Sequence, residues 1–68
     1  MRQKLKFKII RKYKTITNFA KEIGYGRVKI SMILHKKIAG SIKFWRAVQK
    51  ALDISDTELL EYMDDINE

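Results

Sequence analysis

The feature that most constrains this sequence is a helical spacing of apolar residues, in a chain of 68 residues with no proline and only three glycines. Proline and glycine interrupt helices, so this chain has few points at which a helix must stop. Residues 42–52 show the spacing most clearly, because at about 100° per residue their apolar and polar side chains fall on opposite arcs. The apolar arc holds Phe44, Trp45, Val48, Ala51 and Leu52, and the polar arc holds Lys43, Arg46, Gln49 and Lys50. We therefore expect an amphipathic helix here, with Ser41 as its N-cap.

A further helix is expected over about residues 55–64. Ser55 and Glu58 have the spacing of a capping box, in which a hydroxyl and a carboxylate satisfy backbone N–H groups at a helix start. The expected buried stripe of this helix consists of Leu59, Leu60 and Met63. Tyr62 and Met63 fit either the core or a contact between subunits.

The middle of the chain, about residues 16–35, predicts two short helices joined by a tight turn. Thr15 or Thr17 would cap the first, and Gly24 lies where it should end, because glycine adopts the left-handed conformation that closes many helices. The inward face of the first helix consists of Phe19, Ala20 and Ile23. The inward face of the second, about residues 27–35, consists of Ile30, Ile33 and Leu34.

The N-terminal residues fit two patterns. Leu5, Phe7 and Ile9 alternate with lysines, as in a strand. Leu5, Ile9 and Tyr13, with Ile10, follow a helical spacing instead. We favour the helix over residues 4–10, because nothing else in the chain has the pattern of a strand that could pair with it. The expected fold is thus all-α, a single domain over residues 1–68 with about five short helices.

Composition excludes several classes of function. The chain has no cysteine, which rules out disulfides and thiol chemistry and fits the reducing cytoplasm. A lone histidine without cysteine or nearby acids cannot build a metal site, so we expect no metal and no cofactor. No Ser/His/Asp or Cys/His set of catalytic side chains is present, so we do not expect this chain to be an enzyme. No apolar run approaches the roughly 18 residues of a membrane span, and no signal peptide is recognisable.

Charge is strongly segregated along the chain. Residues 1–52 hold all 15 Lys and Arg and one acid, Glu22, which gives +14; residues 53–68 hold the other seven acids and no base, which gives −7. This arrangement indicates a polyanionic partner, with nucleic acid as the first candidate and an anionic membrane surface as the second. The defined caps and turns argue against a basic amphipathic membrane helix, which needs no tertiary partner. The acidic segment 53–68 would suit a contact with a protein.

The outward face of the helix at 27–35 is the candidate binding surface. It carries Arg27, Val28, Ser31, Met32 and His35, with Lys29 beside them. A short helix held on its inner face by a tight turn to another helix fits the major groove of DNA, which is about 12 Å wide.

Residues 15–52 resemble the helix-turn-helix of the Cro/cI-type phage repressors and their bacterial relatives, the lambda-repressor-like family. That family has a small residue within its first motif helix, a glycine four residues later, and an Ile-Ser pair in its recognition helix. Here these positions hold Ala20, Gly24, Ile30 and Ser31, and Ile33 matches the second inward apolar position. The segment from Asp53 to Tyr62 is similar to the fifth helix of the family.

Four positions depart from the family pattern. Leu34, Lys36 and Gly40 stand where the family often has an acid, a glycine and a proline. Gly26 replaces the usual serine or threonine cap of the recognition helix, and glycine is an acceptable N-cap.

The resemblance implies sequence-specific binding to double-stranded DNA by a small Cro-like repressor, acting as a homodimer on a palindromic operator. The implied contacts with base edges are Arg27, Val28, Ser31, Met32 and His35. The implied contacts with phosphates are Ile16, Thr17, Asn18, Lys29, Lys36, Lys37 and Ser41. The alternative is an antitoxin-like or antirepressor-type protein-interaction module with the same fold. Either would act in the cytoplasm of a bacterial host, encoded by the host or a phage.

Overall fold

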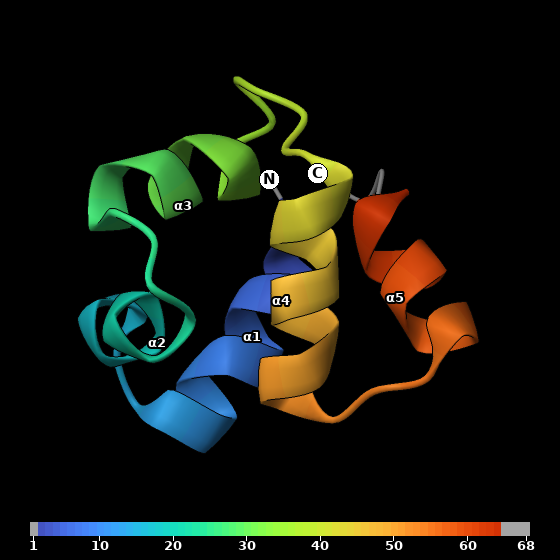
Figure 1. Cartoon of the computed structure of the whole chain (residues 1–68), viewed down its shortest axis with the longest axis horizontal. Helices are drawn as coiled ribbons and strands as arrows, with labels where there is room; N and C mark the ends of the chain where they lie inside the picture. The colour runs from blue at the N-terminus through green and yellow to red at the C-terminus, as the bar shows by residue number, and fades with distance from the viewer. Residues whose placement is uncertain (1, 65–68) are drawn as a thin grey trace.

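Five α-helices make up residues 2–64, the part of the chain that the structure, a computed structural model, describes. They are α1 (Gln3–Tyr13), α2 (Ile16–Ile23), α3 (Arg27–Leu34), α4 (Ile42–Leu52) and α5 (Asp56–Met63). No strand occurs within this range, so the all-α prediction is confirmed and residues 4–10 are helical. In Figure 1, α1 and α4 cross at the centre, α2 and α3 lie on one side of them, and α5 lies on the other.

The predicted hydroxyl caps form at three helix starts, whereas the Glu58 carboxylate of the predicted capping box bonds Tyr62 and Lys8 instead of the Ser55 N–H. The hydroxyls of Thr15, Ser41 and Ser55 accept the backbone N–H groups of Asn18, Phe44 and Glu58 at 3.0, 3.1 and 3.1 Å. Such a bond satisfies one of the four orphan donors at each helix start. Thr15, and not Thr17, is therefore the cap of α2.

The turn between α2 and α3 closes as the sequence predicts. Gly24 has φ +74°, in the left-handed region, and its N–H donates to the carbonyl of Ala20 at 2.9 Å. Gly26 then precedes α3 in extended conformation. Only one residue, Tyr25, separates the two glycines, so α2 and α3 are held close together.

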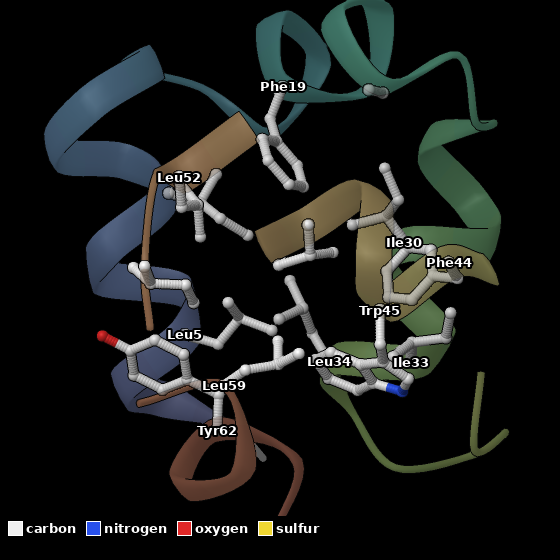
Figure 2. Packing of buried hydrophobic residues seen from close by; sticks show 14 residues of the cluster. Leu5, Phe19, Ile30, Ile33, Leu34, Phe44, Trp45, Leu52, Leu59 and Tyr62 are labelled. Atoms are coloured by element: carbon white, nitrogen blue, oxygen red, sulfur yellow. The ribbon is translucent and has the colours of Figure 1, made fainter. Parts of the chain in front are cut away.

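One apolar core joins all five helices (Figure 2). Its buried members are Leu5, Ile9, Phe19, Ala20, Ile30, Ile33, Leu34, Phe44, Trp45, Val48, Leu52, Ile54, Leu59 and Tyr62. Phe44 stacks edge-to-face against Tyr25 and Trp45, with ring centroids 5.2 and 5.3 Å apart. Burying a large apolar side chain contributes roughly 1.5–3 kcal/mol, so the interlocked rings are a main source of stability.

The buried stripe of α5 is not the one predicted. Leu59 is buried, but Leu60 is 56% exposed and Met63 only half-buried, while Tyr62 is buried in its place. Leu59 and Tyr62 are three residues apart and so share a face, whereas Leu60 is turned about 100° from Leu59. The tyrosine packs its ring inward and keeps its hydroxyl at the surface, where it meets Glu58.

Two apolar residues of α1 lie outside the core. Ile10, which the helical pattern placed beside the core residues, is 38% exposed, and Phe7 is 66% exposed. Leu5 and Ile9 alone are fully buried from this helix, and Tyr13 is half-buried. The inward stripe of α1 is therefore narrower than predicted.

Candidate nucleic-acid interface

Helix α3 is oriented by its inner face. Ile30, Ile33 and Leu34 are between 0 and 3% exposed and lie in the core. Because the helix has 3.6 residues per turn, its remaining side chains must point to solvent. The exposed residues are Arg27, Val28, Lys29, Ser31 and Met32, followed by His35 at the C-cap. The predicted helical phase of this segment is confirmed.

A shallow depression of about 380 Å³ gathers the residues predicted to contact base edges. Five of its lining residues are Arg27, Val28, Ser31, Met32 and His35. The others are Leu34 from α3 itself, Ile16 from the start of α2, and Lys6 from α1. We call this group of residues the α3 face. It combines a guanidinium, an ammonium group, a hydroxyl and an imidazole with four apolar side chains.

The polar groups of the α3 face are not used within the domain. Among residues 2–64, the side chains of Arg27, Ser31 and His35 have no hydrogen-bond or ion-pair partner. Their donors and acceptors are therefore available to a ligand. Val28 is 69% exposed and Met32 37%, so apolar surface is also left open beside them.

The N-terminal end of α3 is anchored through the turn that precedes it. The ring of Tyr25 packs on Phe44, and the Nζ atom of Lys29 lies 5.2 Å from the centroid of the same ring. A cation over an aromatic face is attracted by the ring quadrupole. Lys29 therefore leans toward the turn, at the edge of the α3 face.

Two of the residues predicted to contact phosphate have side chains engaged in local structure. The Asn18 amide donates to the carbonyl of Tyr13 at 2.9 Å, across the junction of α1 and α2. The Ser41 hydroxyl accepts the N–H of Phe44, so its own proton remains free to be donated. Thr17 is exposed on the first turn of α2, and Ile16 lines the α3 face.

Lys36 and Lys37 lie apart from the other predicted contacts. They follow the C-terminal end of α3 and line a second depression of about 620 Å³. Its other lining residues are Arg2, Ile38, Ala39, Met63 and Asp64. The structure therefore places these two lysines between the ends of α3 and α5, and not among the residues predicted to contact bases.

From the sequence, Lys6 was considered only as part of the lysine run from Lys4 to Lys14, which could contact DNA or form a solvated face, and Arg2 was not singled out. Lys6 precedes Ile10 by one helical turn, so its place on the flank of α1 follows once α1 is known to be a helix. Arg2 is only 8% exposed and contacts backbone carbonyl groups of two other helices. No residue pattern signals such contacts, because every residue has a carbonyl group.

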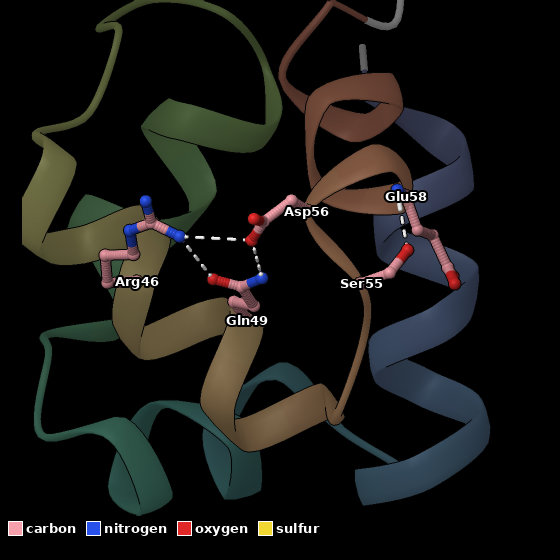
Figure 3. Close-up of polar contacts among 5 residues, drawn as sticks. All are labelled: Arg46, Gln49, Ser55, Asp56 and Glu58. Atoms are coloured by element: carbon pink, nitrogen blue, oxygen red, sulfur yellow. Dashed lines mark hydrogen bonds and ion pairs between the residues drawn. The ribbon is translucent and has the colours of Figure 1, made fainter.

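Two acids of helix α5, Asp56 and Glu58, are bonded to neighbouring helices, and Figure 3 shows the contacts of Asp56. Asp56 Oδ1 accepts from Gln49 Nε2 at 2.6 Å and lies 3.3 Å from Arg46 Nη1. The hydrogen bond from Gln49, and next the charge of Arg46, lower the pKa of Asp56. The bonds join α5 to the exposed side of α4.

A second polar group joins α5 to α1. Glu58 Oε2 accepts from the Tyr62 hydroxyl at 2.5 Å and lies 3.4 Å from Lys8 Nζ. The Tyr62 bond, and after it Lys8, lower the pKa of Glu58, although partial desolvation opposes them. Burial, and then the Glu58 carboxylate, raise the pKa of Tyr62 to about 12. The residues of this contact therefore stay a carboxylate and a neutral phenol through the neutral pH range.

An apolar groove of about 270 Å³ lies between α4 and α5. Its lining includes Ile42, which is 72% exposed, and Leu60, which is 56% exposed. Trp45, Leu59 and Met63 complete its apolar lining, and Arg46 and Asp56 complete its polar lining. We call it the α4–α5 groove. From the sequence we expected two copies to pair around residues 52–63. The lining residues from α5 fall in that range, whereas Ile42, Trp45 and Arg46 come from the start of α4 and lie outside it.

Residues 2–64 hold no group of three or more His, Cys, Asp or Glu side chains that could bind a metal ion. Within the same range, every helix is too short or too polar to cross a membrane. Asp65 and Glu68, which the predicted acidic segment included, lie outside the described residues.

Comparison of the chain with models of known families, with curated proteins and with solved structures finds no match.

Proposed function

We propose that this chain is a lambda-repressor-like helix-turn-helix domain that binds specific sequences in double-stranded DNA through α3 and represses transcription. The observation that carries this proposal is the α3 face. Five residues with chemistry suited to base edges line one depression, and the polar ones among them have no partner within residues 2–64.

The side chains of the α3 face match distinct features of the major groove. The guanidinium of Arg27 can donate to O6 and N7 of a guanine together. Val28 and Met32 suit the methyl group of thymine, which would cover the apolar surface that they expose. Ser31 and His35 can donate to or accept from several base edges.

The surroundings of the α3 face are basic, which favours a polyanion. Lys6 lies in the depression, Lys29 at its edge, and Lys36 with Lys37 beyond the C-terminal end of α3. On this proposal the lysines contact phosphates, which orient a protein on DNA without reading its sequence. The N–H groups at the start of α4, beside Ser41, would add a further phosphate contact.

Two copies are needed for useful specificity. One short helix reads only a few base pairs, too few to single out one site in a genome. A homodimer on half-sites about 34 Å apart doubles the sequence that is read. On this proposal the two copies meet at the α4–α5 groove, through Ile42 and Leu60. The groove is small, so we expect weak association without DNA.

Selection of bound duplexes from a random pool tests the proposal. We expect a palindromic consensus, tighter binding to it than to a scrambled duplex, and two copies of the chain per duplex by native mass spectrometry. Equal affinity for the selected and scrambled duplexes would contradict sequence-specific binding. A complex with one copy per palindrome at saturating protein would contradict the dimer.

A protein-interaction module is the second candidate, and the α4–α5 groove is the observation that favours it. Ile42 and Leu60 expose apolar surface beside the acidic helix α5. Copurification of a second polypeptide, lost in Leu60→Glu and retained in Met32→Ala, would support this function. Equal capture by both variants would argue against a role for the groove.

A further inference from the structure

Arg2 is buried to an extent that is unusual for arginine. It precedes α1, yet it is only 8% exposed. Its Nη1 atom donates to the carbonyl of Ile33 at 2.5 Å, and its Nη2 atom donates to the carbonyl of Met63 at 3.2 Å. One guanidinium thus contacts the last turn of α3 and the last residue of α5.

Two further contacts fix the position of Arg2. Its guanidinium carbon lies 5.2 Å from the ring centroid of Trp45, and its backbone N–H donates to the carbonyl of Leu34 at 2.7 Å. Trp45 is itself held, because its Nε1 atom donates to the carbonyl of Ala39 at 3.1 Å. Arg2 is therefore attached to α3, α5, and through Trp45 to α4.

The charge of Arg2 suits its position. The last carbonyl groups of a helix lack partners within the helix and carry partial negative charge, so a cation stabilises them. The planar guanidinium presents several N–H groups in fixed directions, so one side chain can serve two helix ends at once. An ammonium group lacks this geometry.

Arg2 also links two helices that flank the central pair and meet only near their C-terminal ends. Helices α3 and α5 are on opposite sides of α1 and α4 (Figure 1). The N-terminal end of α3 is held separately, by Tyr25 in the turn that precedes it. The tilt of α3, and with it the height of Met32 and His35 at the surface, therefore depends on what holds its C-terminal end.

We propose that Arg2 is a positioning residue: it fixes the C-terminal end of α3 against the C-terminal end of α5, and so couples the α3 face to the α4–α5 groove. Its effect on DNA binding rests on the function proposed above, but the coupling itself does not. A partner bound at the groove then changes ligand affinity at the α3 face, and the reverse effect has the same size.

Hydrogen exchange of the free protein tests the coupling without any DNA. In Arg2→Met, which keeps a long side chain but has no donors, exchange should rise about 10- to 100-fold at residues 33–38 and 61–64, because charge-assisted hydrogen bonds are lost. Exchange at Val48, inside α4, should change much less. The matched control is Tyr62→Phe, which loses a bond of α5 but none of α3; it should alter residues 58–64 only.

A second variant separates the effect of the planar guanidinium geometry from the effect of the positive charge. Arg2→Lys keeps the cation, but one ammonium should not hold both carbonyl groups, so exchange should still rise at one helix end. If Arg2→Met fails to fold, Arg2→Lys serves for the same comparison. An equal rise over all five helices would mean that Arg2 only stabilises the fold, and the proposal would be wrong.

The consequence for DNA is measured separately, at fixed salt. Arg2→Met should lower the ratio of affinities for selected and scrambled duplexes at least fivefold, with the salt dependence unchanged. An unchanged ratio, with the wild-type chain binding specifically, would overturn the positioning role. If the wild-type chain binds neither duplex, the proposed function fails, while the exchange result still decides the coupling.

Discussion

The α3 face and the acidic helix α5 both carry exposed polar side chains, but they use them differently. On α5, Asp56 is bonded to Arg46 and Gln49, and Glu58 to Tyr62 and Lys8. On the α3 face, the polar side chains have no partner within residues 2–64. Polar groups that are bonded within a domain help to hold it together, whereas groups left without partners are free to meet a ligand. This difference is our reason for proposing α3 as the binding element.

The two sides of α3 give the largest expected effect. Ile30→Asp should abolish folding, because Ile30 is 1% exposed and a charge there would be buried without a partner. Met32→Ala should leave the melting temperature nearly unchanged, because Met32 lies on the exposed side. Thermal melts followed by circular dichroism measure both. Equal destabilisation would mean that the outer side of α3 also supports the fold.

The salt dependence of binding tests whether the basic residues on the α3 side contact phosphates. If a bound dimer makes roughly 6–10 phosphate contacts, affinity should fall about 10³- to 10⁵-fold between about 50 and 200 mM salt. Fluorescence anisotropy with a labelled duplex measures this. A flat salt dependence would show that contacts between these basic residues and phosphates contribute little to binding.

Arg27 and Lys37 carry the same charge but should contribute differently to DNA binding. Arg27 lies on the α3 face, and Lys37 in the second depression. Arg27→Ala should cost roughly 1–3 kcal/mol on the selected duplex and little on a scrambled one. Lys37→Ala should weaken binding to both equally and lower the salt slope by about one.

Titration of both variants against both duplexes at one salt concentration separates these roles. If Arg27→Ala weakened binding to both duplexes equally, Arg27 would contact phosphate. Base recognition would then fall to Val28, Ser31, Met32 and His35.

The contribution of Asp56 and Glu58 to stability should depend on pH, and this is the smallest of the effects expected here. The pKa values of Asp56 and Glu58 are lowered from 3.8 and 4.5 by the hydrogen bonds that they accept. Their contribution to stability is therefore full above these unfolded values and is lost as pH falls through the folded ones. The melting temperature should decline slightly below about pH 4, and less so in the double variant Asp56→Asn/Glu58→Gln. An equal decline in both proteins would assign the acid sensitivity to other groups.

The sequence predicts this fold well wherever the cause is local. The periodicity of α4, the glycine that ends α2, and the serine caps depend on residues within one or two turns, and the structure confirms them. The five side chains of the α3 face were predicted for the same reason, since burying Ile30 and Ile33 fixes the phase of the helix. Whether they contact bases stays a prediction.

The predictions were wrong or incomplete where contacts between distant parts of the chain decide which side chains are buried and where they lie. Helix α5 has eight residues, and the stripe predicted for it was Leu59, Leu60 and Met63. The fold instead buries Leu59 and Tyr62. Arg2 binds carbonyl groups more than 30 residues away, which leave no mark in the sequence. The place of Lys36 and Lys37 depends on the path of the α3–α4 loop, which residue types do not specify.

The opposed positions of α3 and α5 also affect how the molecule moves before any contact forms. Helix α5 contains three acids and no base, whereas α3 contains two bases and no acid, and the two helices lie on opposite sides of α1 and α4 (Figure 1). The charges of these two helices contribute a dipole moment directed from α5 toward α3. In the field of any polyanion it experiences a torque that turns α5 away, so rotational diffusion during approach is biased toward one orientation. Fewer collisions are then wasted on the wrong side, and the gain disappears at distances beyond the Debye length, about 8 Å at physiological salt.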